Sequence, residues 1–193
     1  MIKDMKKFIF TLVLFLATTN LMAQEHLSFK GIPIEGSITE FCKKLEAKGL
    51  SSMGTEDNVT LFTGDFTGRE ATIAVAATDD GKNVFSVVVL FDSSEEWNTL
   101  VNTYDYYKDL YTRKYGIPTK SKENNPAHSN ENIFLMDKLN SGTVVWASAW
   151  KVTGGDIELS IEKSNGYLSG MVMIRYRDAQ NVEAKIQRDL EDI

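Results

Sequence analysis

Residues 84–97, VFSVVVLFDSSEEW, determine the predicted architecture because they join a buried strand to the start of a helix. In residues 84–91 both alternating faces are apolar, which indicates a central strand that is covered at least partly on both sides. Ser93 and Glu96 then have the Ser-x-x-Glu spacing of a capping box, which satisfies two free N–H groups at a helix start. The stretch therefore predicts a strand followed directly by a capped helix.

Helices are predicted at three places in the chain. The helix that follows residue 93 has large apolar residues at helical spacing up to Tyr115, and Gly116 ends it. Its tyrosines are predicted to be core residues rather than a binding surface. A second capping box, opened by Ser37, begins a helix over residues 37–48, and a short amphipathic helix is predicted over residues 178–190.

Short β-branched or apolar runs, separated by turns rich in Gly, Asp and Asn, predict the remaining strands. These runs are residues 59–62, 71–77, 133–139, 144–152, 157–161 and 168–176. We expect an α+β protein built from tandem α-β-β-β units, with halves at about residues 29–92 and 93–193. Helices packed on one face of an antiparallel sheet would bury both apolar surfaces, so residues 24–193 are predicted to form a single domain.

The first 23 residues have the three-part layout of a secretory signal peptide. Lysines at positions 3, 6 and 7 precede an apolar run at residues 8–17, and Ala23 precedes the predicted cleavage point. The apolar run is too short to stay in a bilayer as a permanent anchor. We therefore expect an exported protein, periplasmic or extracellular, without a transmembrane anchor in its mature chain.

Charge and cysteine content narrow the classes of partner. Removing the three lysines and Asp4 of residues 1–23 from 21 basic and 27 acidic residues leaves 18 and 26, a formal net charge of −8. This balance, without clusters of Lys or Arg, argues against nucleic acid and anionic membranes as partners. Cys42 is the only cysteine, so no internal disulfide forms, and its place on an apolar helix face predicts a buried, inert thiol.

The chain contains no motif that indicates a metal site, a cofactor or a catalytic centre. His26, His128 and Cys42 stand in unrelated contexts, whereas a metal needs several converging ligands. No Gly-x-Ser-x-Gly nucleophile turn and no glycine-rich phosphate loop is present. We therefore assign no catalytic residue and expect a protein that is not an enzyme.

Two features suggest binding. Trp146 and Trp150 share one face of a predicted strand, and the opposite face is small, including Ala147 and Ala149. If a helix packs on the small face, the Trp face points outward as flat contact area for a partner or sugar ring; alternatively, both Trp residues are core. The second feature is the polar loop at residues 120–132, which contains His128 and is either functional or disordered.

Caps and turns spread over most of the mature chain carry a resemblance. They are residues 29–37 (FKGIPIEGS), Phe41, Leu45, residues 61–66, Trp97, Tyr104, residues 114–116, Pro118, residues 174–178 (IRYRD) and Asn181. In these positions the chain is similar to an uncharacterised secreted or periplasmic family of Bacteroides-type bacteria, which implies an origin and an export address rather than an activity. The tandem order also resembles β-lactamase inhibitor proteins, which implies a binding module by analogy of topology.

Three functions follow from these patterns. The first is an exported, non-enzymatic module that recognises a protein partner through an exposed sheet face. The second is a protein that binds a small ligand or a glycan, with Trp146 and Trp150 stacking on a ring. The third is an envelope hydrolase of unrecognised type, which requires carboxylates or a histidine beside an activated nucleophile in a cleft.

Overall fold

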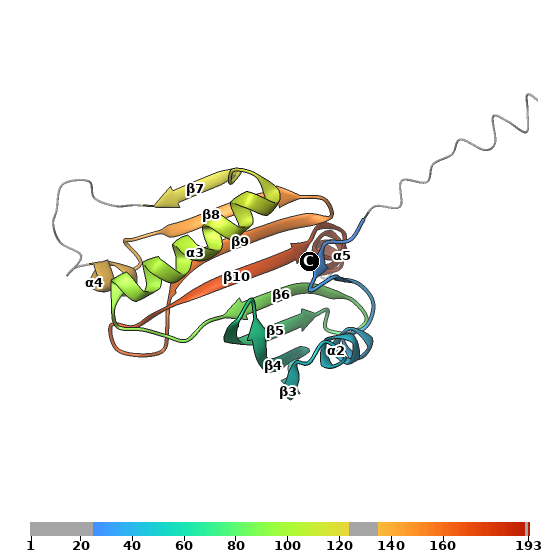
Figure 1. The fold of residues 1–193 in the computed structure, drawn as a ribbon. Coiled ribbons are helices and arrows are strands. Elements are labelled where there is room, and N and C mark those ends of the chain that lie inside the picture. The colour runs from blue at the N-terminus through green and yellow to red at the C-terminus, as the bar shows by residue number, and fades with distance from the viewer. Residues whose placement is uncertain (1–24, 124–134, 192) are drawn as a thin grey trace, which may run out of the picture.

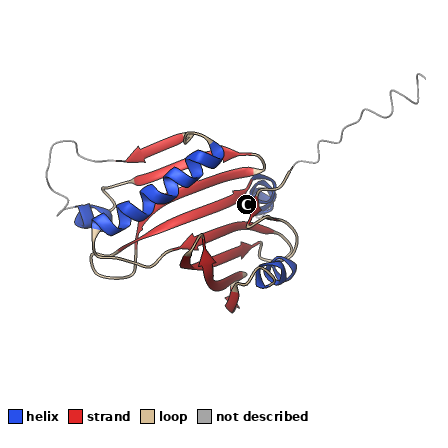
Figure 2. Ribbon diagram, in the orientation of Figure 1, coloured by secondary structure: helices blue, strands red, loops and turns tan. Residues whose placement is uncertain are grey.

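The computed structural model describes residues 25–123, 135–191 and 193 (Figure 1). Its elements in chain order are β1 (Ser28–Phe29), β2 (Ile32–Pro33), α2 (Ile38–Glu46), β3 (Ser51–Glu56), β4 (Val59–Phe66), β5 (Arg69–Ala77), β6 (Val84–Leu90), α3 (Trp97–Tyr115), β7 (Lys120–Glu123), α4 (Leu135–Asn140), β8 (Trp146–Val152), β9 (Gly155–Lys163), β10 (Gly170–Asp178) and α5 (Ala179–Glu191). Figure 2 shows helices beside a broad sheet, which confirms a mixed α+β protein. The predicted signal peptide and His128 lie outside the described residues. Within those residues, no helix has both the length and the apolar character needed to cross a membrane.

Eight strands form one antiparallel sheet in the order β3-β4-β5-β6-β10-β9-β8-β7. The halves meet at its centre, where Val89 of β6 lies opposite Ile174 of β10. The first half is α2 followed by β3 to β6, and the second is α3 followed by β7 to β10, with α4 inserted before β8. The predicted α-β-β-β unit is therefore not confirmed, because each half contributes four strands to one shared sheet.

The two additional strands, β3 and β7, are the edges of the sheet. All six residues of β3 are exposed, and β7 is the polar segment Lys-Ser-Lys-Glu. Neither strand has to bury a face, so neither carries the alternating apolar pattern that identifies a strand in a sequence. The prediction of an irregular loop from residue 120 is thus wrong for residues 120–123.

The strand predicted at residues 133–139 is also wrong in its described part, where α4 forms. Leu135, Met136 and Leu139 are buried. Their spacing of one and three residues places them on one side of a helix, whereas it would put them on both sides of a strand.

The two predicted capping boxes have different outcomes. Ser37 caps α2 as predicted, and its Oγ accepts a hydrogen bond from the N–H of Glu40 at 3.3 Å. At α3 the N-cap is Glu96, which makes no side-chain cap bond, so the second box is wrong. The reason is that Ser94 is held in the sheet by backbone hydrogen bonds with Gly170, and the helix begins beyond it at Trp97.

Helices α2 and α3 pack on the same face of the sheet, which we call the covered face. A line of cross-strand partners follows this face through Trp150, Ile157, Tyr176, Val87, Val75 and Thr60. At one end of the line Trp150 lies against Tyr111 of α3, and at the other end α2 packs on β5, the strand that carries Val75. Figure 1 shows α3 crossing β8, β9 and β10 on this side.

The N-terminal segment is hydrogen-bonded to the start of α5. This helix begins at Ala179, one residue after the start predicted from the sequence. Asp178 is fully buried, and its carboxylate accepts hydrogen bonds from the N–H of Leu27 at 2.8 Å and of Asn181 at 3.0 Å. The Asn181 side chain donates to the carbonyls of Ile34 and Val84. The first and last described segments therefore form one packed corner.

Candidate functional site

The tryptophan pair faces helix α3. Trp150 is 1% exposed, its ring centroid lies 5.5 Å from that of Tyr111, and its Nε1–H donates to the carbonyl of Gly116 at 2.9 Å. Trp146 is half-buried and meets Trp97 edge to face at 5.3 Å. The outward-facing alternative for these two residues is therefore wrong, and the core alternative is confirmed.

Strand pairing explains why the tryptophans point inward. Trp150 lies opposite Ile157 and Trp146 lies opposite Ile161, so the tryptophans share a face with the apolar side of β9. The small residues Ala147 and Ala149 lie opposite Ser160 and Glu158, on the polar side. Cross-strand partners project to the same side, so the buried face of β9 dictates the buried face of β8.

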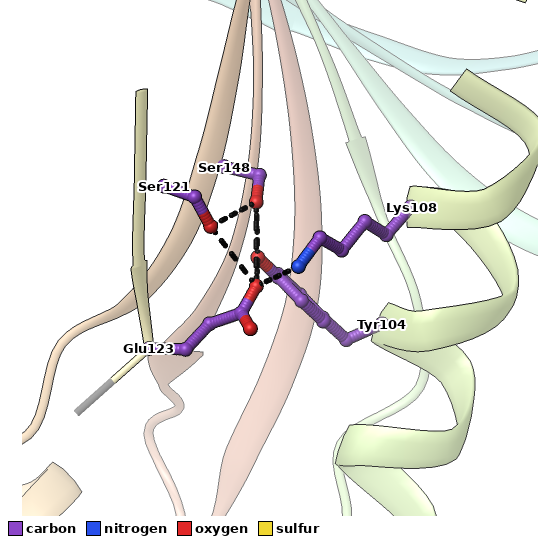
Figure 3. Close-up of polar contacts among 5 residues, drawn as sticks. All are labelled: Tyr104, Lys108, Ser121, Glu123 and Ser148. Atoms are coloured by element: carbon purple, nitrogen blue, oxygen red, sulfur yellow. Dashed lines mark hydrogen bonds and ion pairs between the residues drawn. The ribbon is translucent and has the colours of Figure 1, made fainter. Parts of the chain in front are cut away.

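A polar cluster links α3 to the edge strand β7 (Figure 3). The hydroxyl of Tyr104 lies 2.7 Å from Ser148 Oγ and 3.0 Å from Glu123 Oε1, and Lys108 Nζ forms an ion pair with the same Oε1. Ser121 Oγ lies 3.1 Å from Glu123 Oε1 and 3.0 Å from Ser148 Oγ. Four side chains from α3, β7 and β8 thus converge on the Glu123 carboxylate.

The charges of this cluster suit a structural link better than catalysis. Burial raises the pKa of Tyr104, and the neighbouring Glu123 carboxylate raises it further, so the phenol stays protonated and is no base. Burial opposes ionisation of Glu123, but the hydrogen bonds from Lys108 and Tyr104 prevail and lower the pKa of Glu123. Ser148 is 1% exposed, so its hydroxyl is out of reach of a substrate. The cluster fixes the edge strand to the helix.

The sheet face opposite α2 and α3 carries a continuous set of half-buried side chains, which we call the open face. Its residues are Thr63, Thr72, Ala74, Ala76, Val88, Leu90, Ala147, Ala149, Asp156, Glu158, Met171, Arg175 and Arg177. They come from β4, β5, β6, β8, β9 and β10. Small and aliphatic residues form two flanks, and four charged residues lie between them.

Ion pairs between neighbouring strands neutralise the centre of the open face. Arg177 lies 2.7 Å from Asp156 Oδ1, and both Arg175 and Arg177 lie 3.6 Å from Glu158 Oε2. All four side chains keep between 28% and 41% of their surface exposed. The pairs therefore remain in contact with water and can exchange partners at low energetic cost.

A concave region lies on the other side of the molecule from the open face, between the second half of α3 and the β1–β2 segment. It has a volume of about 350 Å³, and we call it the aromatic groove. Its aromatic and basic lining consists of Lys30, Phe66, Tyr107, Tyr111, Lys114, Tyr115 and Tyr176. An adjoining hollow of about 610 Å³ shares Lys30, Lys114, Tyr115 and Tyr176 and adds Lys151 and His26.

The structure brings neither predicted tryptophan into the open face or the aromatic groove. Trp146 and Trp150 lie in the core beneath α3, and His128 is outside the described residues. The groove residues were not predicted as a site, because they come from four separate segments of the chain. Only the tyrosine spacing on α3 was visible, and it correctly indicated burial of Tyr104, Tyr107 and Tyr111.

Comparisons with known proteins and a search for metal ligands add no further assignment. The chain matches no protein-family model, no curated protein and no solved structure. Within residues 25–123, 135–191 and 193, no three His, Cys, Asp or Glu side chains converge in a way that could hold a metal ion. The function must therefore be argued from the open face, the polar cluster and the aromatic groove.

Proposed function

We propose that this protein is an exported, non-catalytic binding module that recognises a protein partner through its open face. The observation that carries the proposal is the composition of that face, with arginines and a methionine amid small and aliphatic residues on six strands. Arginine and methionine are enriched in protein interfaces, and arginine is common among the residues that dominate binding energy. Export rests on the signal-peptide layout of residues 1–23.

The size of the sheet suits a protein partner. The six strands of the open face, spaced about 4.8 Å apart, span roughly 24 Å, and strands of about seven residues are roughly 23 Å long. The product, roughly 550 Å², approaches the roughly 600 Å² that each partner contributes to a specific interface at the small end of the size range. A small molecule would use only a fraction of this area, whereas a folded partner can cover it.

The paired charges suit recognition of a protein with mixed charge. Arg175 and Arg177 can turn from Glu158 and Asp156 to a carboxylate of the partner, which leaves Glu158 and Asp156 free for its basic residues. Such exchange adds specificity more than affinity, because exposed ion pairs contribute little energy. The flanking alanines permit close approach of the partner's backbone.

The test is affinity capture from the envelope fraction of the native cell, comparing wild type with two arginine variants. Ala149→Arg places a bulky cation on the open face, and Asn102→Arg places the same side chain on the exposed side of α3. Both variants must first show wild-type thermal unfolding. We expect one partner to be captured by wild type and Asn102→Arg and lost with Ala149→Arg. Equal capture by all three, or capture of no partner, would refute recognition through this face.

A further inference from the structure

The aromatic groove combines ring surfaces with a basic rim. Phe66 of β4 and Tyr176 of β10 line it from the sheet, and Tyr107, Tyr111 and Tyr115 line it from α3. The rings of Tyr111 and Tyr115 stack with centroids 5.9 Å apart. Lys30 and Lys114 border the rings, and their ammonium groups lie 5.8 Å from Phe66 and 4.9 Å from Tyr115.

Three lysines around this groove have no carboxylate partner among the described residues. Lys30 Nζ donates to the backbone carbonyl of Asp65 at 2.9 Å, and no ion pair involves Lys114 or Lys151 there. By contrast, Lys108 and Lys185 pair with carboxylates elsewhere on the chain. The hollow that all three lysines line contains one carboxylate, Glu25, so three positive charges and one negative charge leave a net charge of +2 that attracts an anion.

A phenol pair supplies a further donor at the groove. The hydroxyls of Tyr111 and Tyr176 hydrogen-bond to each other, and either can be the donor. Only one hydrogen lies between the two oxygens, so the second hydrogen has no acceptor among the described residues. Burial raises the pKa of both tyrosines, which keeps both hydroxyls protonated at neutral pH. A ligand oxygen in the groove would accept this unused hydrogen.

We propose that the aromatic groove binds an acidic saccharide, whose carboxylate is held by Lys30 and Lys114 and whose ring packs on Tyr115 and its aromatic neighbours. A sugar ring presents an apolar C–H face to aromatic side chains and hydroxyls to polar groups such as Thr67 and the phenols. The carboxylate matches the lysines and the unused phenol hydrogen. The site is separate from the open face, so this inference does not depend on the protein-binding proposal.

Calorimetric titration of the purified protein tests the inference with matched probes. The probes are a trimer of galacturonic acid, the corresponding neutral galactose trimer, and benzoate as an aromatic acid without a sugar ring. We expect the acidic trimer to bind, with affinity falling as salt rises, and to bind at least tenfold more tightly than either other probe. No binding of the acidic trimer at millimolar concentration would overturn the proposal, as would equal affinity for the neutral trimer or for benzoate.

Two variants locate the site, with a lysine control on the opposite half of the chain. Lys114→Gln removes one exposed cation of the groove, and Tyr176→Phe removes one phenol oxygen while keeping the ring. Each should weaken binding of the acidic trimer several-fold, whereas Lys43→Gln on the exposed side of α2 should leave it unchanged. Lys114 and Lys43 are both on the surface, so neither change endangers folding. Equal weakening by Lys114→Gln and Lys43→Gln would show attraction by net charge alone and refute a built site.

Discussion

Replacing Trp150 by alanine tests the assignment of the two sheet faces. The side chain is 1% exposed, packs against Tyr111 and donates a hydrogen bond to the carbonyl of Gly116. Truncating a buried tryptophan to alanine costs about 3–5 kcal/mol, because the transfer energy is lost and a cavity remains. The midpoint of thermal unfolding should fall by roughly 6–20 °C, since 1 kcal/mol shifts it by about 2–4 °C in a protein of this size.

The measurement is urea unfolding followed by far-ultraviolet circular dichroism, which does not rely on the fluorescence of the replaced tryptophan. Trp150→Phe keeps an aromatic ring but removes the Nε1–H donor, so its cost should be smaller, about 1–2 kcal/mol. Tyr167→Ala is the control, because that side chain is 87% exposed and its loss should change stability by less than about 0.5 kcal/mol.

A result below about 1 kcal/mol for Trp150→Ala would refute the reasoning, since no fully packed tryptophan is removed at so small a cost. It would mean that this strand face is exposed and that Ala147 and Ala149 lie beneath the helix instead. The open face would then be assigned to the wrong side of the sheet, and Ala149→Arg should destabilise the fold. The stability of these two variants therefore tests the same assignment from both sides.

Three further predictions concern the polar cluster, a close backbone approach and the thiol. Glu123→Gln should destabilise the protein at pH 7 but much less near pH 3, and urea unfolding at both pH values measures the difference. The pKa of Glu123 is lowered in the folded protein, so its carboxylate stabilises the fold above the unfolded-state pKa of about 4.3. That contribution is lost as the pH falls through the pKa of the folded state. Gly154→Ala should lower the free energy of unfolding by about 1–3 kcal/mol more than Gly116→Ala in the same assay. Both glycines have a positive φ, +83° and +85°, so the backbone strain is matched. Only at Gly154 would an added Cβ clash, because it would lie 2.4 Å from the nitrogen of Leu27. Burial raises the pKa of Cys42, so iodoacetamide should alkylate it more slowly at pH 8 in the folded protein than in urea, and equal rates would contradict this.

The parts of the fold that could be predicted from the sequence are those set by local patterns. The cap at Ser37 requires only residues within one turn, and β4, β5, β6, β9 and β10 all contain apolar runs that must be buried. The two edge strands could not be found in this way, because an edge strand exposed on both faces carries no periodic signal. At residues 135–140 the apolar residues were recognised, but their period was assigned to a strand instead of a helix.

The direction of the tryptophan face could not be read from β8 alone. One face of that strand is large and the other is small, and a helix can pack on either. The pairing of Trp150 with Ile157 resolves the choice, and this register depends on a turn and on β9 rather than on β8. The alternating pattern of β9 was visible in the sequence, so the register is the single missing piece of information.

The aromatic groove shows that the net charge of a chain excludes fewer classes of partner than its sign suggests. An acidic chain without runs of Lys or Arg has no extended basic surface for a polyanion such as nucleic acid. That argument concerns neighbours in sequence, whereas Lys30, Lys114 and Lys151 are separated by 84 and 37 residues and meet only in the fold. Because screening limits each charge to about 10 Å, a small anion in the groove or the adjoining hollow responds to these three cations and to Glu25 far more than to the rest of the acidic chain. A negative total charge is therefore compatible with a site for a small anion, provided that distant segments bring the cations together.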